Sequence, residues 1–194
     1  MKKYILLLTI ILTSCSTLKI EEQIVHDLIK GKILNSHIKN LPKYLIEDAN
    51  SSQIIINYYE MALADKNLDN YKRRIDFRPQ NFSNWPIDNE EINKIRKIQE
   101  KENLSYKWEA LKFKNLDIPV ISENELFSKI DNNILPTNTI GLIISKPILS
   151  LNKKYALIEY SNIYYVGGTK TTFFLMEKID GKWAVKLEIF NTNE

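Results

Sequence analysis

Few side chains in this sequence have the types and spacing that catalysis or metal binding requires. The 194 residues include two histidines, His26 and His37, and a single cysteine, Cys15. An unbroken helix would place both histidines on one face, but a metal site needs third and fourth ligands, and the spacing offers none. One cysteine excludes an internal disulfide, and five glycines leave no phosphate-binding loop. We therefore expect no metal and no cofactor.

Carboxylate chemistry has one distinctive candidate, Glu159, which lies inside a predicted strand. A glycosidase needs two acids about 5 to 10 Å apart across a cleft, and a sequence does not place the second. If Glu159 faced the interior its pKa would rise, which would mark a candidate site. Strand alternation favours the opposite interpretation, with Glu159 on the water-facing side. No Gly-x-Ser-x-Gly, Ser-x-x-Lys or His-Glu-x-x-His motif is present.

Aromatic residues gather between residues 155 and 183, and Tyr160, Tyr164 and Phe174 are the candidates for an exposed binding surface. Exposed aromatic side chains supply recognition surfaces at low entropic cost. The alternative is that helices cover the sheet and the aromatic side chains pack inside it. We favour packing, because core aromatics are the commoner case.

Residues 1–14 are typical of a secretory signal peptide. Lys2 and Lys3 supply a positive start, and a nearly unbroken apolar run follows over residues 4–12. A membrane-spanning helix needs about 20 apolar residues. The run therefore suits export and is too short for a permanent anchor.

The end of this segment, Leu12-Thr13-Ser14-Cys15, resembles the lipobox of bacterial lipoproteins. The resemblance implies that signal peptidase recognises Leu12, Thr13 and Ser14, that a diacylglycerol is attached to the Cys15 sulfur, and that cleavage precedes Cys15. Two alternatives remain: cleavage one residue later would release an ordinary secreted protein, or Cys15 is an incidental thiol. The resemblance implies a membrane-anchored envelope lipoprotein, in the outer membrane by default if the cell has two membranes.

Charge argues against a nucleic-acid binder. The whole chain carries a formal net charge of +3 from 27 basic and 24 acidic residues. Removal of Lys2 and Lys3 with the signal peptide leaves about +1, whereas phosphate binding needs a basic surface. The one basic cluster is Lys72-Arg73-Arg74 with Arg78. We interpret it as a solvated loop, with attraction to an anionic membrane as the alternative.

Periodicity predicts helices over residues 20–41, interrupted or ended near Gly31, and over residues 52–65. Asp88 and Ser122 begin two more helices, each with a glutamate three residues later that could complete a capping box. Residues 66–87 are predicted to be an irregular connection, and Tyr106–Phe113 a strand.

From residue 139 the pattern predicts strands. They are expected at residues 140–144, 155–166, 169–178 and 182–190, with hairpins at Gly167-Gly168 and Asp180-Gly181. In the last strand, alternation predicts one buried face and one wet face. Helices followed by an antiparallel meander of about four strands indicate an α+β fold, with residues 15–194 as a single mature domain.

Stretches of the C-terminal half, among them Lys154–Ile158 and Asp180–Trp183, resemble the ends of small bacterial envelope lipoproteins of unknown function. The final hairpin is also similar to those of cone-shaped domains like nuclear transport factor 2. The leading hypothesis is a lipid-anchored, non-catalytic module that contacts the membrane through its lipid and binds an envelope protein or glycan. An envelope hydrolase using carboxylates on a glycan or ester is the alternative, and a purely structural role at the membrane is a third.

Overall fold

The computed structural model describes residues 19–34, 40–50, 53–79, 81–101 and 106–191. Residues 1–14, Cys15 and His37, on which several of the predictions above depend, lie outside the described residues. The helices are α2 (Ile20–Leu28), α3 (Gln53–Asp65), α4 (Asn89–Gln99), α5 (Ala110–Phe113) and α6 (Glu123–Asp131), with a π-helix at Ile29–Ile33 and 3-10 turns at Asn70–Lys72 and Lys114–Leu116.

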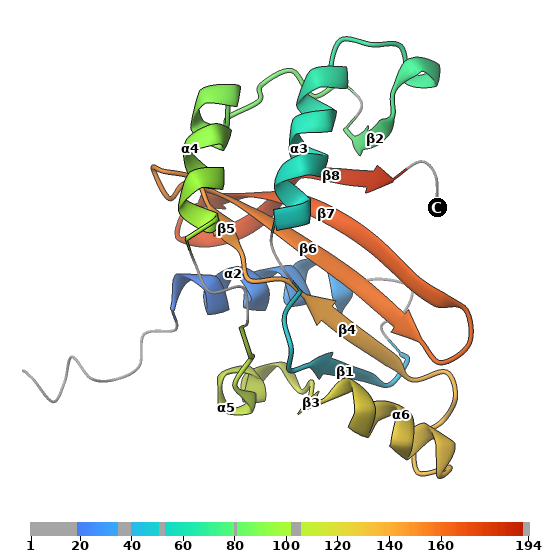
Figure 1. The fold of residues 1–194 in the computed structure, drawn as a ribbon. Helices are drawn as coiled ribbons and strands as arrows, with labels where there is room; N and C mark the ends of the chain where they lie inside the picture. Colours follow the sequence, from blue (N-terminus) through green and yellow to red (C-terminus); the bar gives the residue numbers. More distant parts are fainter. Residues whose placement is uncertain (1–18, 35–39, 51–52, 80, 102–105, 192–194) are drawn as a thin grey trace, which may run out of the picture.

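One mixed sheet of eight strands organises the described chain (Figure 1). Its order is β2-β8-β7-β6-β4-β1-β3, with β5 paired to β6 beside this path. The strands are β1 (Lys43–Ile46), β2 (Ile75–Arg78), β3 (Val120–Ile121), β4 (Ile140–Ile144), β5 (Ile148–Leu149), β6 (Tyr155–Tyr164), β7 (Gly168–Ile179) and β8 (Lys182–Asn191). The predicted α+β class is confirmed, but the sheet is larger than a four-stranded meander.

Helices cover both faces of the sheet. On one face, α2 packs against an apolar cluster that includes Ile158 and Met176, which we call the α2-side core. On the other, α3 and α4 pack against a cluster that includes Leu157 and Leu175, which we call the α3-side core. Figure 1 shows α3 and α4 in front of the sheet and α2 crossing behind it. Successive strand residues point to opposite faces, so both sets of side chains are buried.

The predicted meander is present as β4, β6, β7 and β8, each antiparallel to the next. Its hairpins use the expected glycines: φ is +120° at Gly167, +78° at Gly168 and +81° at Gly181. These positive angles are readily adopted by residues without a Cβ, which explains why local sequence located the turns correctly.

The prediction that one face of β8 is buried and the other wet is wrong. A β-bulge between Leu175 and Met176 shifts the register against β8. Trp183 and Val185 consequently join the α2-side core, whereas Leu187 joins the α3-side core. A bulge adds one residue to one strand, so the side chains beyond it change faces.

Two stretches differ from their predicted structure. Residues 106–113 do not form a strand, because Lys107 makes a single bridge to Asp48 and α5 then begins. Buried Trp108 fastens this stretch to the sheet by donating from Nε1 to the carbonyl oxygen of Ile144 at 3.0 Å. The predicted irregular connection over residues 66–87 contains β2, which pairs antiparallel with β8.

The helix starts at Asp88 and Ser122 are confirmed. Asp88 Oδ1 accepts from the amide of Glu91 at 2.8 Å, and Ser122 Oγ accepts from that of Glu125 at 3.2 Å. The Glu91 side chain, predicted to complete a capping box, instead accepts at Oε1 from the backbone amide of Leu151 at 2.7 Å. Glu91 thus joins α4 to the β5–β6 turn.

Candidate functional site

Glu159 is buried, which corrects the prediction that it faces water. Its exposed fraction is 5%. Glu159 shares a sheet face with Leu157 of the α3-side core and with Ile163, which packs beneath α6. The carboxylate therefore lies on the central strand β6 between two apolar clusters, with Phe173 of β7 as its cross-strand neighbour.

Neutral polar groups surround the Glu159 carboxylate. Asn50 Nδ2 donates to Oε1 at 2.7 Å, and Ser161 Oγ donates to the same oxygen at 3.4 Å. Oε2 is buried without a hydrogen-bond partner in the described structure. Burial raises the pKa of Glu159 above its ordinary value, and the bonds from Asn50 and Ser161 oppose that rise only in part.

Hydroxyl groups of neighbouring strands lie next to Glu159. Ser145 Oγ accepts from the Glu159 amide at 2.9 Å, and Ser161 Oγ lies 2.8 Å from Thr171 Oγ1. A carboxyl group with a raised pKa can act as a general acid. Two-carboxylate hydrolysis needs a partner acid, and none of the groups that shift the Glu159 pKa is a second carboxylate. Among the described residues, no cluster of three or more metal-ligating side chains is present.

Two of the three residues predicted as a binding surface are buried. Tyr160 and Phe174 belong to the α2-side core, with exposed fractions of 9% and 5%. The Tyr160 hydroxyl donates to Asn162 Oδ1, and Tyr164 is half-buried against the same core. The packing interpretation therefore holds for Tyr160 and Phe174, because α2 covers the face onto which they point.

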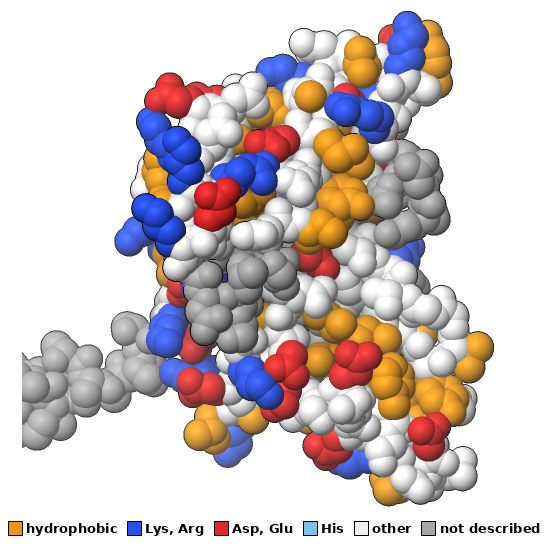
Figure 2. Space-filling model, viewed as in Figure 1, with side chains coloured by type: hydrophobic (Ala, Val, Ile, Leu, Met, Phe, Trp, Pro, Cys, Tyr) orange, Lys and Arg blue, Asp and Glu red, His pale blue; other side chains and the backbone are white. Residues whose placement is uncertain are grey.

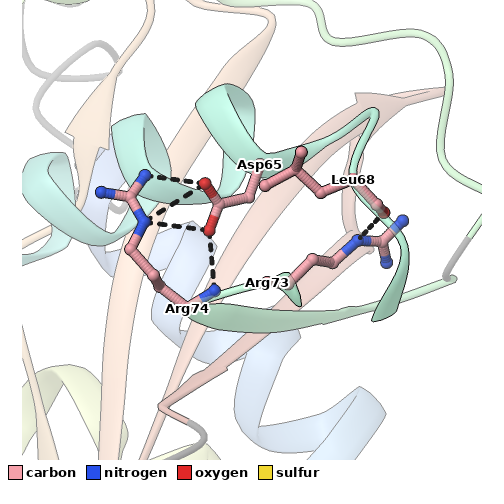
Figure 3. Close-up of polar contacts among 4 residues, drawn as sticks. All are labelled: Asp65, Leu68, Arg73 and Arg74. Atoms are coloured by element: carbon pink, nitrogen blue, oxygen red, sulfur yellow. Dashed lines mark hydrogen bonds and ion pairs between the residues drawn. The ribbon is translucent and has the colours of Figure 1, made fainter. Parts of the chain in front are cut away.

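Two residues of the basic cluster, Arg73 and Arg74, bind neighbouring parts of the chain (Figure 3). Arg74 donates from Nη2 to Asp65 Oδ1 at 2.7 Å and from its backbone amide to Asp65 Oδ2 at 2.8 Å. Arg73 donates from Nε to the Leu68 carbonyl oxygen at 2.9 Å, with its guanidinium 4.3 Å from the centre of the Phe77 ring. These contacts close the chain between α3 and β2, which gives Arg73 and Arg74 structural roles.

His26 is a core residue of α2 with an exposed fraction of 8%. Its ring stacks on Phe113 with 6.1 Å between centroids, and its Nε2 is buried without a partner in the described structure. Burial lowers the pKa of His26, so the neutral ring is favoured. The burial and stacking indicate a packing role for this histidine.

Two adjoining cavities lie beside the Asp117–Pro119 segment, at the edge of the sheet next to β3. The first has a volume of about 450 Å³ and the second about 440 Å³. Asp117, Ile118 and Pro119 line both. Asp117 ends the preceding 3-10 turn in a left-handed conformation, with φ at +55°, and so directs Ile118 and Pro119 towards β1. The wall between the cavities thus follows from one sharp turn.

We call the first cavity the Lys43 cavity. Its apolar wall consists of Leu34, Leu41, Pro42, Leu116, Ile118 and Pro119. Lys43, Tyr44 and Asp117 supply its polar groups. Lys43 is the first residue of β1 and has an exposed fraction of only 9%. Its Nζ donates to the Leu41 carbonyl oxygen at 2.9 Å, and burial lowers the pKa of Lys43.

Sequence analysis did not find the Lys43 cavity. Its lining comes from chain segments that are about 75 residues apart, on either side of α3 and α4. Parallel pairing of β1 with β3 and β4 brings these segments together. A run of four residues such as Lys43–Ile46 carries too little periodicity to predict a strand, and no other local signal marks the site.

No protein-family model, curated protein or solved structure matches this chain. In the described part of the chain, no helix has the length and apolar character needed to cross a membrane. Figure 2 shows basic and acidic side chains interspersed over α3 and α4 on the face viewed. The geometry of the cavities and of Glu159 is therefore the basis for assigning a function.

Proposed function

We propose that this protein is a lipid-anchored protein of the bacterial cell envelope that binds an envelope component without catalysis. The anchoring part is supported by Leu12-Thr13-Ser14-Cys15 directly after an apolar run of export length. Cys15 precedes Lys19, where the described chain begins, by four positions, so even a fully extended connection could span at most about 14 Å. A lipid on Cys15 would therefore hold the folded part close to the membrane surface.

The binding part depends chiefly on the two cavities beside Asp117–Pro119. Their volumes lie within the range of about 300 to 1,000 Å³ that is usual for small-molecule sites. The Lys43 cavity combines an apolar wall with a few polar groups, the arrangement such sites use to fix a ligand's orientation. This location replaces the aromatic surface that the sequence suggested.

An envelope hydrolase is the second candidate, and the burial of Glu159 favours it. A carboxyl group with a raised pKa suits general acid catalysis. The binding function is preferred because Glu159 does not line either of the two cavities beside Asp117–Pro119 and has no second carboxylate among the groups that shift its pKa.

Mass spectrometry of the chain purified from bacterial membranes tests the anchor. We expect a mature chain that begins at Cys15 and carries a diacylglycerol, and we expect Cys15→Ala to remain unprocessed and unlipidated. A mature chain that begins after Cys15 would overturn the anchor and support ordinary secretion.

Site-specific photo-cross-linking in cells tests the binding part. The probe replaces Leu111, which lines the second cavity and is 83% exposed. The matched control replaces Ile134, which is 68% exposed and lines neither cavity. An adduct of the same envelope component from Leu111 only is expected. Equal labelling from both positions would contradict a binding site at the cavities.

A further inference from the structure

We infer that one end of the sheet docks on an anionic lipid bilayer, with the side chains of Ile98, Leu151 and Ile179 at the level of the lipid headgroups. We call it the turn end. It consists of the β5–β6 turn (residues 151–154), the β7–β8 hairpin (residues 179–182) and the adjoining end of α4. The inference rests on the proposed lipid anchor and states how the anchored protein is oriented.

Strand pairing brings the two turns together. Because β6 and β7 are antiparallel neighbours, the start of β6 lies beside the end of β7, and the amide of Lys178 donates to the carbonyl oxygen of Lys154 at 2.9 Å. Helix α4 is joined to them where Glu91 accepts from the amide of Leu151. Figure 1 shows both turns on the side of the molecule where α2 begins.

The position of the anchor carries the first step. Glu21, in the first turn of α2, lines a cavity of about 220 Å³ together with Ile98 of α4 and with Leu151 and Lys153 of the β5–β6 turn. Glu21 lies six positions after Cys15, so a lipid on Cys15 would enter the bilayer at most about 21 Å from Glu21. The anchor therefore holds the turn end close to the membrane surface.

Apolar side chains carry the second step. Ile98, Leu151 and Ile179 have exposed fractions of 47%, 49% and 51%. A single exposed apolar residue is ordinary on a soluble protein, but here three from separate segments lie at one end of the sheet. Contact with the headgroup region of a bilayer would remove their exposed surface from water.

Basic side chains carry the third step. The exposed lysines at the turn end are Lys97, Lys101, Lys153, Lys154 and Lys182. Among the described residues there, the exposed carboxylates are Glu100 and Asp180, and Glu21 is half-buried, so lysines are in excess. Figure 2 shows basic side chains along the outer edge of α4. An anionic leaflet attracts such lysines, and apolar residues flanked by lysines are typical of binding at the membrane interface.

The surface around α5 also lies near the start of α2, since Lys112 of α5 pairs with Glu22 of α2 at 3.7 Å. It has an exposed leucine, Leu111. Lys107, just before α5, pairs with Glu47 at 2.9 Å, so two lysines of this surface are already compensated by carboxylates. Charge complementarity therefore favours the turn end as the surface that meets an anionic bilayer.

The test uses the lipidated full chain, purified from bacterial membranes and placed in nanodiscs. Ile98→Cys, Leu151→Cys and Val166→Cys are each labelled with bimane, which nitroxide groups on the lipid headgroups quench. Val166 is 80% exposed and follows the far end of β6, whose ten residues span about 30 Å. With phosphatidylglycerol in the nanodisc, we expect quenching at positions 98 and 151 to be about fivefold stronger than at position 166. Thermal unfolding checks each variant, and Leu151→Cys decides the result by itself if Ile98→Cys does not fold.

Lipid charge and lysine charge test the electrostatic part. Quenching of both turn-end labels should be weaker in nanodiscs of phosphatidylcholine alone and in about 0.5 M salt. Lys97→Gln combined with Lys153→Gln should lower the ratio of docked to undocked chain about thirtyfold, from roughly fivefold for each lysine. The matched control combines Lys66→Gln with Lys170→Gln, which removes the same charge from exposed lysines outside the turn end. It should leave the ratio nearly unchanged.

Equal quenching at all three labelled positions would overturn the docked orientation. Quenching that depends neither on lipid charge nor on Lys97 and Lys153 would overturn the anionic bilayer as the partner. Protection of the turn-end labels from aqueous iodide without quenching by lipid would show that a protein covers this end instead.

The unaltered chain separates failure of the anchor from failure of the docking. Its sole cysteine, Cys15, should not react with bimane when the sulfur carries a diacylglycerol. Labelling of Cys15 would show a free thiol and would contradict the proposed anchor together with the docking. A lipidated chain without quenching at the turn end would contradict the docking alone.

Discussion

Asp65 and Glu159 are two buried carboxylates on the same side of the sheet, yet their surroundings differ. Asp65 ends α3 with an exposed fraction of 3% and accepts hydrogen bonds from the guanidinium and the amide of Arg74. Among the described residues, Glu159, at 5%, accepts only from the neutral side chains of Asn50 and Ser161. The bonds from Arg74 lower the pKa of Asp65, and burial raises the pKa of Glu159.

The difference shows that burial alone does not identify a functional acid. Asp65 has a cation that compensates for its lost hydration, and the pair joins the end of α3 to the start of β2 (Figure 3). Glu159 has no such cation among the groups that shift its pKa, so its ionised form is disfavoured. Asp65 therefore has a structural role. Glu159 is the buried carboxyl group whose raised pKa would suit proton transfer.

The largest expected effect comes from Arg74→Met. The Arg74 side chain is 58% exposed, but its loss leaves the buried Asp65 carboxylate without its cation, and we expect the free energy of unfolding at pH 7 to fall by more than in the control below. Urea denaturation measures the change. The matched control is Arg96→Met, because Arg96 and Glu60 form a pair in which both side chains are about one-third exposed. We expect the control to lose about 0.5 kcal/mol. Equal losses from both variants would contradict the structural role of Asp65.

The second prediction concerns the acid side of the stability profile. The pKa of Asp65 is lower in the folded than in the unfolded chain, so its stabilising contribution is present above the unfolded value of about 3.9 and is lost as pH falls through the folded value. Asp65→Asn should remove this part of the pH dependence of the free energy of unfolding. It should also lower stability at pH 7 by about 1 kcal/mol. The free energy of unfolding measured between pH 2 and 6 checks it. An unchanged acid slope would show that Arg74 does not lower the pKa of Asp65.

Glu159→Gln should change stability at pH 7 in the opposite direction to Asp65→Asn. The folded pKa of Glu159 is raised, so the unfolded chain ionises first as pH rises above about 4.3, and the folded state loses stability until the folded pKa is passed. The neutral amide avoids this loss. We expect the variant to match the wild type near pH 4 and to equal or exceed it by up to about 1 kcal/mol at pH 7. The opposite outcome would be a variant that matches the wild type at pH 4 but is less stable than the wild type at pH 7. It would indicate that a cation compensates the ionised Glu159 carboxylate.

The smallest expected effect separates the two donors to Glu159. Asn50→Ala removes a bond of 2.7 Å and should raise the pKa of Glu159 further, because that bond stabilises the ionised form. Ser161→Ala removes a bond of 3.4 Å and should raise it less, with a stability change at pH 7 of about 0.5 kcal/mol. NMR titration of the Glu159 carboxyl carbon measures both shifts. A larger shift from Ser161→Ala would reverse the assigned importance of the two donors.

Elements with strong local signals were predicted well. The helix caps at Asp88 and Ser122 and the hairpins at Gly167 and Gly181 depend on residues close in sequence, and the structure confirms them. The strand β1 was missed because its pairing partners, β3 and β4, come 75 and 97 residues later. Pairing at that distance leaves no periodic pattern in a four-residue strand.

The candidate sites divide in the same way. Glu159 was identified as a residue of interest, but its direction was predicted incorrectly, because alternation assigns a wet face only when one side of the sheet is uncovered. Here α2 covers one face, while α3 and α6 cover parts of the other. The same coverage buries Tyr160 and Phe174. Lys43 had no signal at all, since the cavity that it lines is completed by residues as distant in sequence as Leu116 and Ile118.

By itself, the sequence determined the features that short-range chemistry controls: the capped helix starts, the glycine hairpins, the antiparallel order of β4, β6, β7 and β8, and an export and lipidation signal that stays a prediction. Tertiary structure alone decided that Glu159 is buried beside neutral donors, that Asp65 is buried beside Arg74, and that Lys43 closes one wall of a cavity. The physical reason is that desolvation, and hence each of these pKa values, depends on which distant segments exclude water from a side chain.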